Sequence, residues 1–360
     1  MIPVTILTGF LGSGKTTLLK RILNEQHGMK IAVIENEFGE ENIDNEILVQ
    51  DSQEQIIQMS NGCICCTIRG DLARVLGDLA QQKRDGKLDF DRVVIETTGL
   101  ANPGPVAQTF FMDNEIAGEF LLDAIITLVD AKHGNHQLDE HEVVQRQVGF
   151  ADRLFVTKAD LVDARELDDL RHRLMHMNPR AQIREVNFGE ADIKEVFDLR
   201  GFNLNAKLEI DPDFLAEDDH NHAHHDHDHD HDHEHAGCDH DHGKCNHEGH
   251  DHGHHHHHAH HDDKIKSFVY RSDRPFDPNR LEDFLGGILQ IYGERLLRYK
   301  GVLYMKGVDR KVVFQGVHQL MGSDLAAKWL PIEKKSSKMV FIGIELPQDL
   351  ITDGLDACLA

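Results

Sequence analysis

A phosphate-binding loop near the start of the chain constrains the fold more than any other feature of the sequence. Residues 9–16 read GFLGSGKT and match the P-loop pattern G-x-x-x-x-G-K-[ST]. The apolar run Val4–Thr8 before the loop predicts a strand, and Leu18–Leu23 after it predicts a helix. We expect the phosphates of a nucleoside triphosphate to contact Gly9, Gly12, Ser13, Gly14, Lys15, Thr16 and Thr17.

Each residue type in this loop suits phosphate binding. The glycines let the backbone turn tightly so that its N–H groups point at phosphate oxygens, and the helix N-terminus adds partial positive charge. Lys15 is predicted to reach the β- and γ-phosphates, and the Thr16 hydroxyl is predicted to bind Mg²⁺. An ordinary glycine turn is the alternative, but it does not explain why every position of the pattern matches between a strand and a helix.

The first 210 or so residues alternate short apolar runs with longer helical patterns. Such alternation indicates an α/β fold, a doubly wound and mostly parallel sheet with helices on both faces. Further strands are predicted at Ile31–Ile34, Ile56–Met59, Arg92–Glu96, Ala124–Val129, Leu154–Thr157 and Ile183–Val186, and helices at, for example, Asp71–Lys83 and Ala164–Met177.

The pattern changes abruptly between residues 220 and 261, which hold 21 of the chain's 28 histidines among Asp, Glu and Gly. No apolar periodicity survives there, so the segment cannot bury enough apolar surface to offset its ordering entropy, and we interpret it as a disordered linker. Neutral imidazoles bind several divalent transition metals, and Cys238 and Cys245 could add a tighter site. A merely solvating linker is the alternative.

Globular patterning resumes after Lys264 and predicts a small α+β domain. Its helix is expected at Asn279–Leu289, with Asp277 as N-cap and Pro278 in the first turn. Its strands are expected at Ile265–Tyr270, Leu297–Met305, Arg310–Val317 and Met339–Leu346. The predicted organisation is therefore a P-loop domain over residues 1–212, a His/Asp-rich linker over 213–263 and a C-terminal domain over 264–360.

The segment Thr157-Lys158-Ala159-Asp160 follows a predicted strand and matches the [NT]-K-x-D pattern that reads guanine. The Asp160 carboxylate can accept hydrogen bonds from the guanine N1–H and exocyclic amine, and adenine has no such donor pair. Alone, a four-residue match is weak and more often reflects a helix-capping aspartate after a strand. Behind a P-loop, Thr157, Lys158 and Asp160 predict that the nucleotide is GTP or GDP.

Glu96-Thr97-Thr98-Gly99 stands where P-loop proteins place an acidic Mg²⁺ partner and a glycine that senses the γ-phosphate. Glu96 is therefore expected to join Lys15 and Thr16 in catalysis, and Gly99 to contact nucleotide. A solvated carboxylate at the strand end is the alternative. No water-positioning residue or arginine finger can be named, so intrinsic hydrolysis is expected to be slow.

Three thiols crowd into four residues at Cys63, Cys65 and Cys66. Thiolates suit Zn²⁺ and softer ions, and two of these three could be completed by a carboxylate or histidine from elsewhere. A redox dithiol or a packing role remains an alternative. The acidic stretch after Ile31–Ile34 supplies the carboxylate candidates Glu35, Glu37 and Glu40, which would otherwise be a solvated loop.

The net charge of the chain limits the classes of partner that it can bind. A formal charge of −25, from 63 acidic and 38 basic residues, argues against general nucleic-acid or anionic-membrane binding and suits a protein that handles cations. No apolar run approaches the length of a membrane span, and no secretory leader precedes the P-loop strand, so we expect a cytoplasmic protein. Histidines outside the tract, including His318, are expected at the surface or as caps.

The motifs GFLGSGKTT, ENEFGE, NGCICC, ETTGLANPGP and TKAD occur here in this order. Together they resemble the CobW-like GTPases, especially the YjiA branch, as do RYKG, VFQGVH and VFIGIELP near the C-terminus. The resemblance covers nearly the whole chain outside the tract. It implies a SIMIBI-type GTPase domain and a CobW C-terminal domain.

The same resemblance implies a GTP-hydrolysing metallochaperone with Mg²⁺ as cofactor and zinc as the leading cargo. Cys63, Cys65 and Cys66 with Glu35, Glu37 and Glu40 are then the transition-metal ligands. A cobalt or nickel insertase, and a metal buffer with a secondary nucleotide site, remain alternatives, and a small-molecule kinase is a remote one. A client metalloprotein is the implied partner, and a homodimer is left open.

Overall fold

The structure of the chain is a computed structural model that describes residues 1–25, 27–35, 56–58, 68–199, 201, 263–330 and 332–360. The predicted linker apart from its last residue Asp263, the three clustered cysteines and most of the acidic stretch after Glu35 lie outside these described residues. Two sheets with their helices account for the regular structure of the described part.

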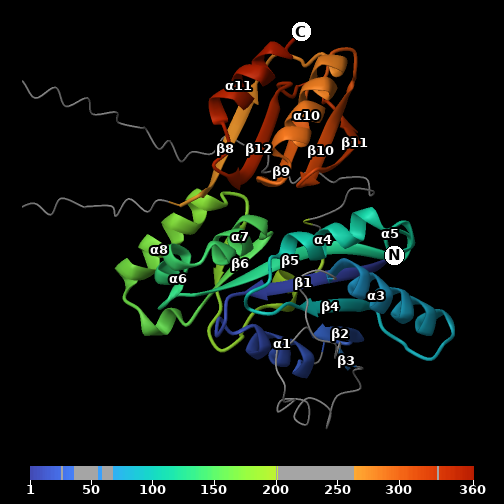
Figure 1. Cartoon of the computed structure of the whole chain (residues 1–360), viewed down its shortest axis with the longest axis vertical. Coiled ribbons are helices and arrows are strands. Elements are labelled where there is room, and N and C mark those ends of the chain that lie inside the picture. The colour runs from blue at the N-terminus through green and yellow to red at the C-terminus, as the bar shows by residue number, and fades with distance from the viewer. Residues whose placement is uncertain (26, 36–55, 59–67, 200, 202–262, 331) are drawn as a thin grey trace, which may run out of the picture. The chain divides into compact units, whose positions relative to one another are not determined.

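The N-terminal sheet has seven strands among the described residues, in the order β3-β2-β4-β1-β5-β6-β7 (Figure 1). Every neighbouring pair in it is parallel. The strands are β1 (Ile2–Gly9), β2 (Ile31–Glu35), β3 (Ile56–Gln58), β4 (Arg92–Glu96), β5 (Phe120–Asp130), β6 (Arg153–Thr157) and β7 (Gln182–Glu185). Nearly continuous burial along β1, β4 and β5 explains their unbroken apolar character, because both faces of the sheet are covered.

Helices cover both faces of this sheet. Helix α1 (Lys15–Asn24) packs Leu18 and Leu19 onto one face, together with α9 (Ile193–Val196). Helices α4 (Pro103–Met112) and α7 (Glu142–Phe150) contact β1 and β5. The other helices here are α3 (Ile68–Arg84), α5 (Asn114–Glu119), α6 (Gly134–Glu140), α8 (Ala164–Met177) and the short 3-10 helix η1 (Ala159–Leu161). The predicted doubly wound fold is confirmed.

The strand order predicts a ligand-binding crevice at the carboxyl end of β1. The chain leaves β1 through α1 toward β2 on one side, whereas β4 is followed by β5 on the other side of β1. Ligands of open α/β sheets bind where the connections diverge in this way, outside the carboxyl ends of the strands. The loops after β1, β4 and β6 all reach this edge.

The second sheet is antiparallel and has the order β11-β10-β9-β12-β8 among the described residues. Its strands are β8 (Ile265–Ser272), β9 (Leu296–Leu303), β10 (Arg310–Val317), β11 (Leu320–Lys328) and β12 (Ser337–Ile344). Helix α10 (Pro278–Tyr292) begins as predicted, because the Asp277 carboxylate accepts hydrogen bonds from the backbone N–H groups of Asn279 and Arg280. Helix α11 (Gln348–Ala357) follows the last strand. The predicted α+β character is confirmed.

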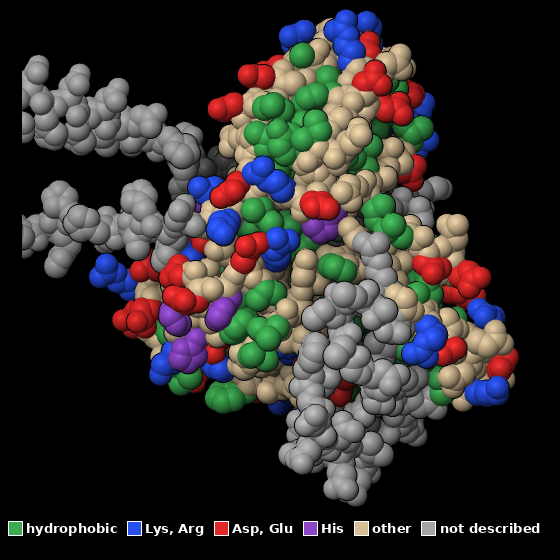
Figure 2. Space-filling model, viewed as in Figure 1, with side chains coloured by type: hydrophobic (Ala, Val, Ile, Leu, Met, Phe, Trp, Pro, Cys, Tyr) green, Lys and Arg blue, Asp and Glu red, His purple; other side chains and the backbone are tan. Residues whose placement is uncertain are grey.

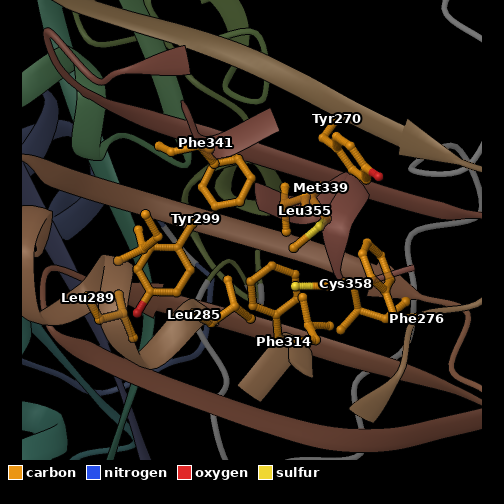
Figure 3. Packing of buried hydrophobic residues seen from close by; sticks show 14 of the residues in the cluster. Tyr270, Phe276, Leu285, Leu289, Tyr299, Phe314, Met339, Phe341, Leu355 and Cys358 are labelled. Atoms are coloured by element: carbon orange, nitrogen blue, oxygen red, sulfur yellow. The ribbon is translucent and has the colours of Figure 1, made fainter. Parts of the chain in front are cut away.

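Aromatic and aliphatic side chains fill the space between this sheet and its two helices (Figure 3). The Tyr299 and Phe314 rings come from neighbouring strands, with centroids 6.0 Å apart, and Leu285 of α10 and Leu355 of α11 are buried in the same cluster. Burial raises the pKa of the Tyr299 hydroxyl, which donates to Leu320 O. Such a core anchors both helices to one face of the sheet.

His318 corrects one prediction, because it is buried rather than at the surface. Its ring lies edge-on to Phe150, with centroids 5.4 Å apart, and its Nδ1 lies 3.2 Å from Gly293 O. Desolvation is the main reason that its pKa is lowered. Nearby, Arg298 donates to Phe150 O and forms an ion pair with Asp152, so polar groups as well as apolar ones are buried here.

On the face drawn in Figure 2, acidic and basic side chains of the described residues are interspersed. None of the described helices has the length and apolar character that a membrane crossing requires.

Candidate functional site

The P-loop joins β1 to α1 in the conformation that its glycines permit. Gly9, Gly12 and Gly14 have φ angles of 143°, 74° and 95°. Residues other than glycine rarely adopt such positive angles. At Gly9 a Cβ atom would stand 2.5 Å from Leu128 O of the neighbouring strand. The loop therefore lies directly against β5, with its last residue at the N-terminus of α1.

Lys15 places its ammonium group inside the loop. Nζ donates to Gly9 O over 2.8 Å and to Phe10 O over 3.1 Å. Burial lowers the pKa of Lys15, and the negative charge of Glu96 partly opposes that change. The hydroxyl of Ser13 is buried and has no hydrogen-bond partner among the described residues. Buried polar atoms usually have partners, so the ammonium and this orphaned hydroxyl fit a loop that holds phosphate oxygens.

Thr16 contacts one carboxylate, and a second lies next to that one in the sheet. The Thr16 hydroxyl donates to Glu96 Oε1 over 2.9 Å, and Glu96 is buried at the end of β4. Glu35 ends the adjacent strand β2 and is in register with Glu96, so both side chains leave the sheet at the same edge. Hydroxyl and carboxylate oxygens are ligands that Mg²⁺ prefers. The donor set brought together here fits the predicted magnesium site.

The loop after β4 lies against the P-loop. Thr97 donates its backbone N–H to Leu7 O and its hydroxyl to Thr8 Oγ1 over 2.9 Å. At Gly99 a Cβ atom would stand 2.6 Å from the backbone nitrogen of Leu11. Only glycine permits this close approach, which explains Gly99 in structural terms.

A cavity of about 350 Å³ opens beside the P-loop. The sequence-predicted residues Thr157, Lys158 and Asp160 line it. Thr157 Oγ1 donates to Ser13 O over 2.8 Å, and Lys158, which has a φ of 57°, forms an ion pair with the buried Asp130 over 2.6 Å. Asp160 is exposed at this cavity in η1. Other lining residues are Gly14, Thr17, Leu18, Leu128 and Val186.

Sequence reasoning missed the loop after β7 that completes this cavity. Phe188 and Gly189 line it and have φ angles of 53° and 75°. Asn187 Oδ1 accepts from the backbone N–H of Ala159 over 3.0 Å and so connects this loop to η1. The Phe188 ring is 77% exposed, which is unusual for a phenylalanine. The Asn-Phe-Gly turn signal after a predicted strand could have indicated this loop.

Comparison with known proteins identifies the family. The nucleotide-binding domain of the CobW/HypB/UreG family matches residues 3–185, and the C-terminal domain of the cobalamin synthesis protein CobW matches residues 265–359. The chain belongs to the CobW/HypB/UreG family. The resemblance predicted from the motifs is therefore confirmed.

Relatives of this CobW-family chain match it along nearly its whole length. It is 39% identical to the zinc chaperone YjiA of Escherichia coli, over 97% of this chain and 96% of that protein. It is 33% identical to the zinc chaperone CobW of Pseudomonas aeruginosa, over 100% of this chain and 92% of the relative. The crystal structure of Zn(II)-bound YjiA GTPase from E. coli matches with a TM-score of 0.72 and 33% identity, covering 100% of this chain and 99% of that one.

The predicted transition-metal ligands are only partly placed in this family member. Glu35 ends β2 beside Glu96, whereas Cys63, Cys65, Cys66, Glu37 and Glu40 lie outside the described residues, as does the histidine tract. No group of three or more metal-binding side chains occurs within the described ranges. The cysteine site therefore stays a prediction.

Proposed function

We propose that this chain is a GTP-hydrolysing metallochaperone that binds zinc and transfers it to a client metalloprotein. One observation supports the nucleotide part above all: the Thr157–Ser13 hydrogen bond joins a cavity lined by Asp160 to a P-loop that contains the buried Lys15. The names of the relatives, which include zinc chaperones, support the metal part.

In this proposal the residues around the cavity bind guanine. Asp160 accepts from the guanine N1–H and exocyclic amine, and the aliphatic part of Lys158 together with Phe188 lies against the base. The Lys158–Asp130 ion pair and the Asn187–Ala159 hydrogen bond hold the two loops in place. Because an unpaired carboxylate at a filled cavity is costly, the site discriminates against adenine.

In the same proposal, residues of the P-loop and of the end of β4 bind the triphosphate and its Mg²⁺. Backbone N–H groups of Gly12, Ser13 and Gly14, with Lys15, stabilise the negative charge of the phosphates. Gly9 and Thr17 complete the loop, and Gly99 lies beside it. Thr16 and Glu96 hold Mg²⁺, which supplies charge neutralisation when it is bound. No arginine finger is evident among the described residues, so we expect slow hydrolysis that responds to metal or client.

Zinc is the cargo, and Cys63, Cys65 and Cys66 with Glu35, Glu37 and Glu40 are its proposed ligands. Thiolates and carboxylates both ligate Zn²⁺. Glu35 belongs to the strand that pairs with the one ending in Glu96, so a change at the magnesium site can reach the start of the acidic stretch. The proposed domains are residues 1–212, 213–263 and 264–360, and the proposed compartment is the cytoplasm.

The test is a competitive titration of Zn²⁺, Co²⁺ and Ni²⁺ into a variant that lacks residues 220–261, in GDP and in a non-hydrolysable GTP analogue. The full-length chain and a Cys65→Ser variant serve as controls. One tight zinc site that depends on Cys65 and changes affinity with the nucleotide is expected. Equal affinity in both nucleotides would remove the coupling, and a preference for cobalt or nickel would change the cargo.

A further inference from the structure

Helix α7 carries a buried glutamine whose side-chain amide donates two hydrogen bonds to the loop after β4. Gln147 is fully buried, and its Nε2 donates to Gly99 O and to Ala101 O, each over 3.1 Å. Thr127 Oγ1 of β5 donates to the backbone oxygen of Gln147 over 2.8 Å, so the base of the side chain is itself fixed. The amide therefore joins a residue held against the sheet to two carbonyls of one loop.

This loop is the one that lies on the P-loop. Its first residue, Thr97, is bonded to the end of β1, and its last, Asn102, accepts from Gly104 N at the start of α4. Between these two ends, Gly99 packs against Leu11 of the P-loop, and as a glycine it has no side chain with which to hold the loop. Gln147 supplies side-chain hydrogen bonds to the middle of the loop, at Gly99 and Ala101.

Fixing these two carbonyls also fixes the N–H groups that follow them. Peptide units are planar, and none of the described ones is cis, so each N–H points away from the carbonyl of its own peptide unit. With Gly99 O and Ala101 O directed at α7, the N–H groups of Leu100 and Asn102 are directed away from α7. Gln147 thus helps to set the orientation of the middle of the loop, whereas Thr97 and Asn102 hold its ends.

We propose that Gln147 is a positioning residue for GTP turnover, which holds residues 97–102 in the orientation that receives the γ-phosphate. This inference rests on the proposed GTPase function and deepens it. Gln147 does not touch the reacting atoms and acts through the loop. GDP lacks the γ-phosphate, so the amide matters for GTP and for hydrolysis but little for GDP.

Gln145 provides a matched control on the same helix. It is also buried, its Nε2 donates to Leu138 O over 2.9 Å, and its Oε1 accepts from the backbone N–H groups of Lys264 and Ile265. None of these partners belongs to the loop after β4. Replacing either glutamine by methionine keeps side-chain length and removes the hydrogen bonds, so the two variants differ chiefly in which contacts are lost.

The experiment measures kcat and KM for GTP, and the affinities for GDP and a non-hydrolysable GTP analogue, in the full-length chain. For Gln147→Met we expect kcat and analogue affinity to fall about tenfold or more, because two neutral hydrogen bonds to the loop are lost, with GDP affinity changed less than about threefold. For Gln145→Met we expect the ratio of analogue to GDP affinity to stay unchanged.

An unchanged ratio in a folded Gln147→Met variant would overturn the proposal, as would an equal loss of GDP affinity, which indicates general destabilisation. If that variant does not fold, Thr127→Val tests the same point, since it releases only the backbone of Gln147 and should shift the ratio in the same direction. No shift there would also overturn it. A wild-type chain that neither binds nor hydrolyses GTP would instead refute the proposed function.

Discussion

Replacing Asp160 by asparagine tests the guanine assignment most directly, because the change is small and its effect on the base is specific. Asp160 lies exposed at the cavity, and its carboxylate forms no ion pair within the described part of the chain. The loop around it is held by other groups: Ala159 N donates to Asn187 Oδ1, and Lys158 pairs with Asp130. The substitution should therefore leave the fold intact.

The magnitude follows from the hydrogen bonds that the carboxylate would make. Two donors on guanine face one charged acceptor, and an exposed charge is screened, so each bond is taken at the low end of its range, about 1.5 kcal/mol. The loss is then about 3 kcal/mol, or about 100-fold in affinity for GDP. Xanthine carries a carbonyl where guanine carries the amine, so the asparagine NH₂ has a new acceptor and xanthosine diphosphate should bind better to the variant.

Calorimetric titration of GDP and of xanthosine diphosphate into the wild type and into Asp160→Asn measures this change in base preference. Asp163→Asn is the control, since Asp163 caps α8 by accepting from Glu166 N and an asparagine can cap in the same way. It should change neither affinity. If Asp160→Asn binds GDP as tightly as the wild type, the carboxylate does not read guanine and the assignment of the cavity to the base is wrong.

Three further predictions address other residues. Lys15→Ala should abolish GTP binding, measured by calorimetric titration with GTP, and leave the number of zinc ions bound per chain nearly unchanged. Normal GTP hydrolysis by this variant would contradict the P-loop assignment. Phe188→Ala should weaken GDP binding about tenfold, as expected for a lost base–aromatic contact, whereas Phe188→Trp should bind normally; equal affinities would remove Phe188 from the site. The pKa of His318 is lowered from 6.5, so the unfolded chain takes up its proton first as pH falls below about 6.5, and the folded state loses stability. Urea unfolding between about pH 7 and pH 5 should show a smaller loss for His318→Gln; an equal loss would mean that this residue does not contribute.

The parallel sheet was predictable because its strands are short apolar runs that follow a regular alternation. The boundaries of β4 and α8 were predicted to the residue, and β5 proved longer because its buried stretch extends back to Phe120. Strand β11 was not predicted. Its first six residues alternate between partly exposed and exposed, as expected at a sheet edge, and the strand includes few of the strongly apolar residues by which strands are recognised.

The candidate site could be predicted from the sequence where one segment carries the whole pattern. The P-loop and Thr157–Asp160 are such segments, and the cavity that Asp160 lines is next to Gly14. Contacts between distant segments were not predictable: the pairing of Thr16 with Glu96 was only implied, Gln147 belongs to no motif, and the turn at Phe188 does not reveal that its ring lines the cavity. Their roles depend on the register and packing of strands that local sequence does not specify.

The hydrogen bond between Thr157 and Ser13 has a consequence for how ligands are recognised. It fixes the distance between the part of the site that fits a base and the part that fits phosphates. A ligand that spans both parts loses its translational and rotational freedom only once, so its affinity should exceed the product of the affinities of its fragments. Guanosine alone and pyrophosphate alone should therefore bind weakly, and an inhibitor of this site would gain most from a rigid connection of matching length.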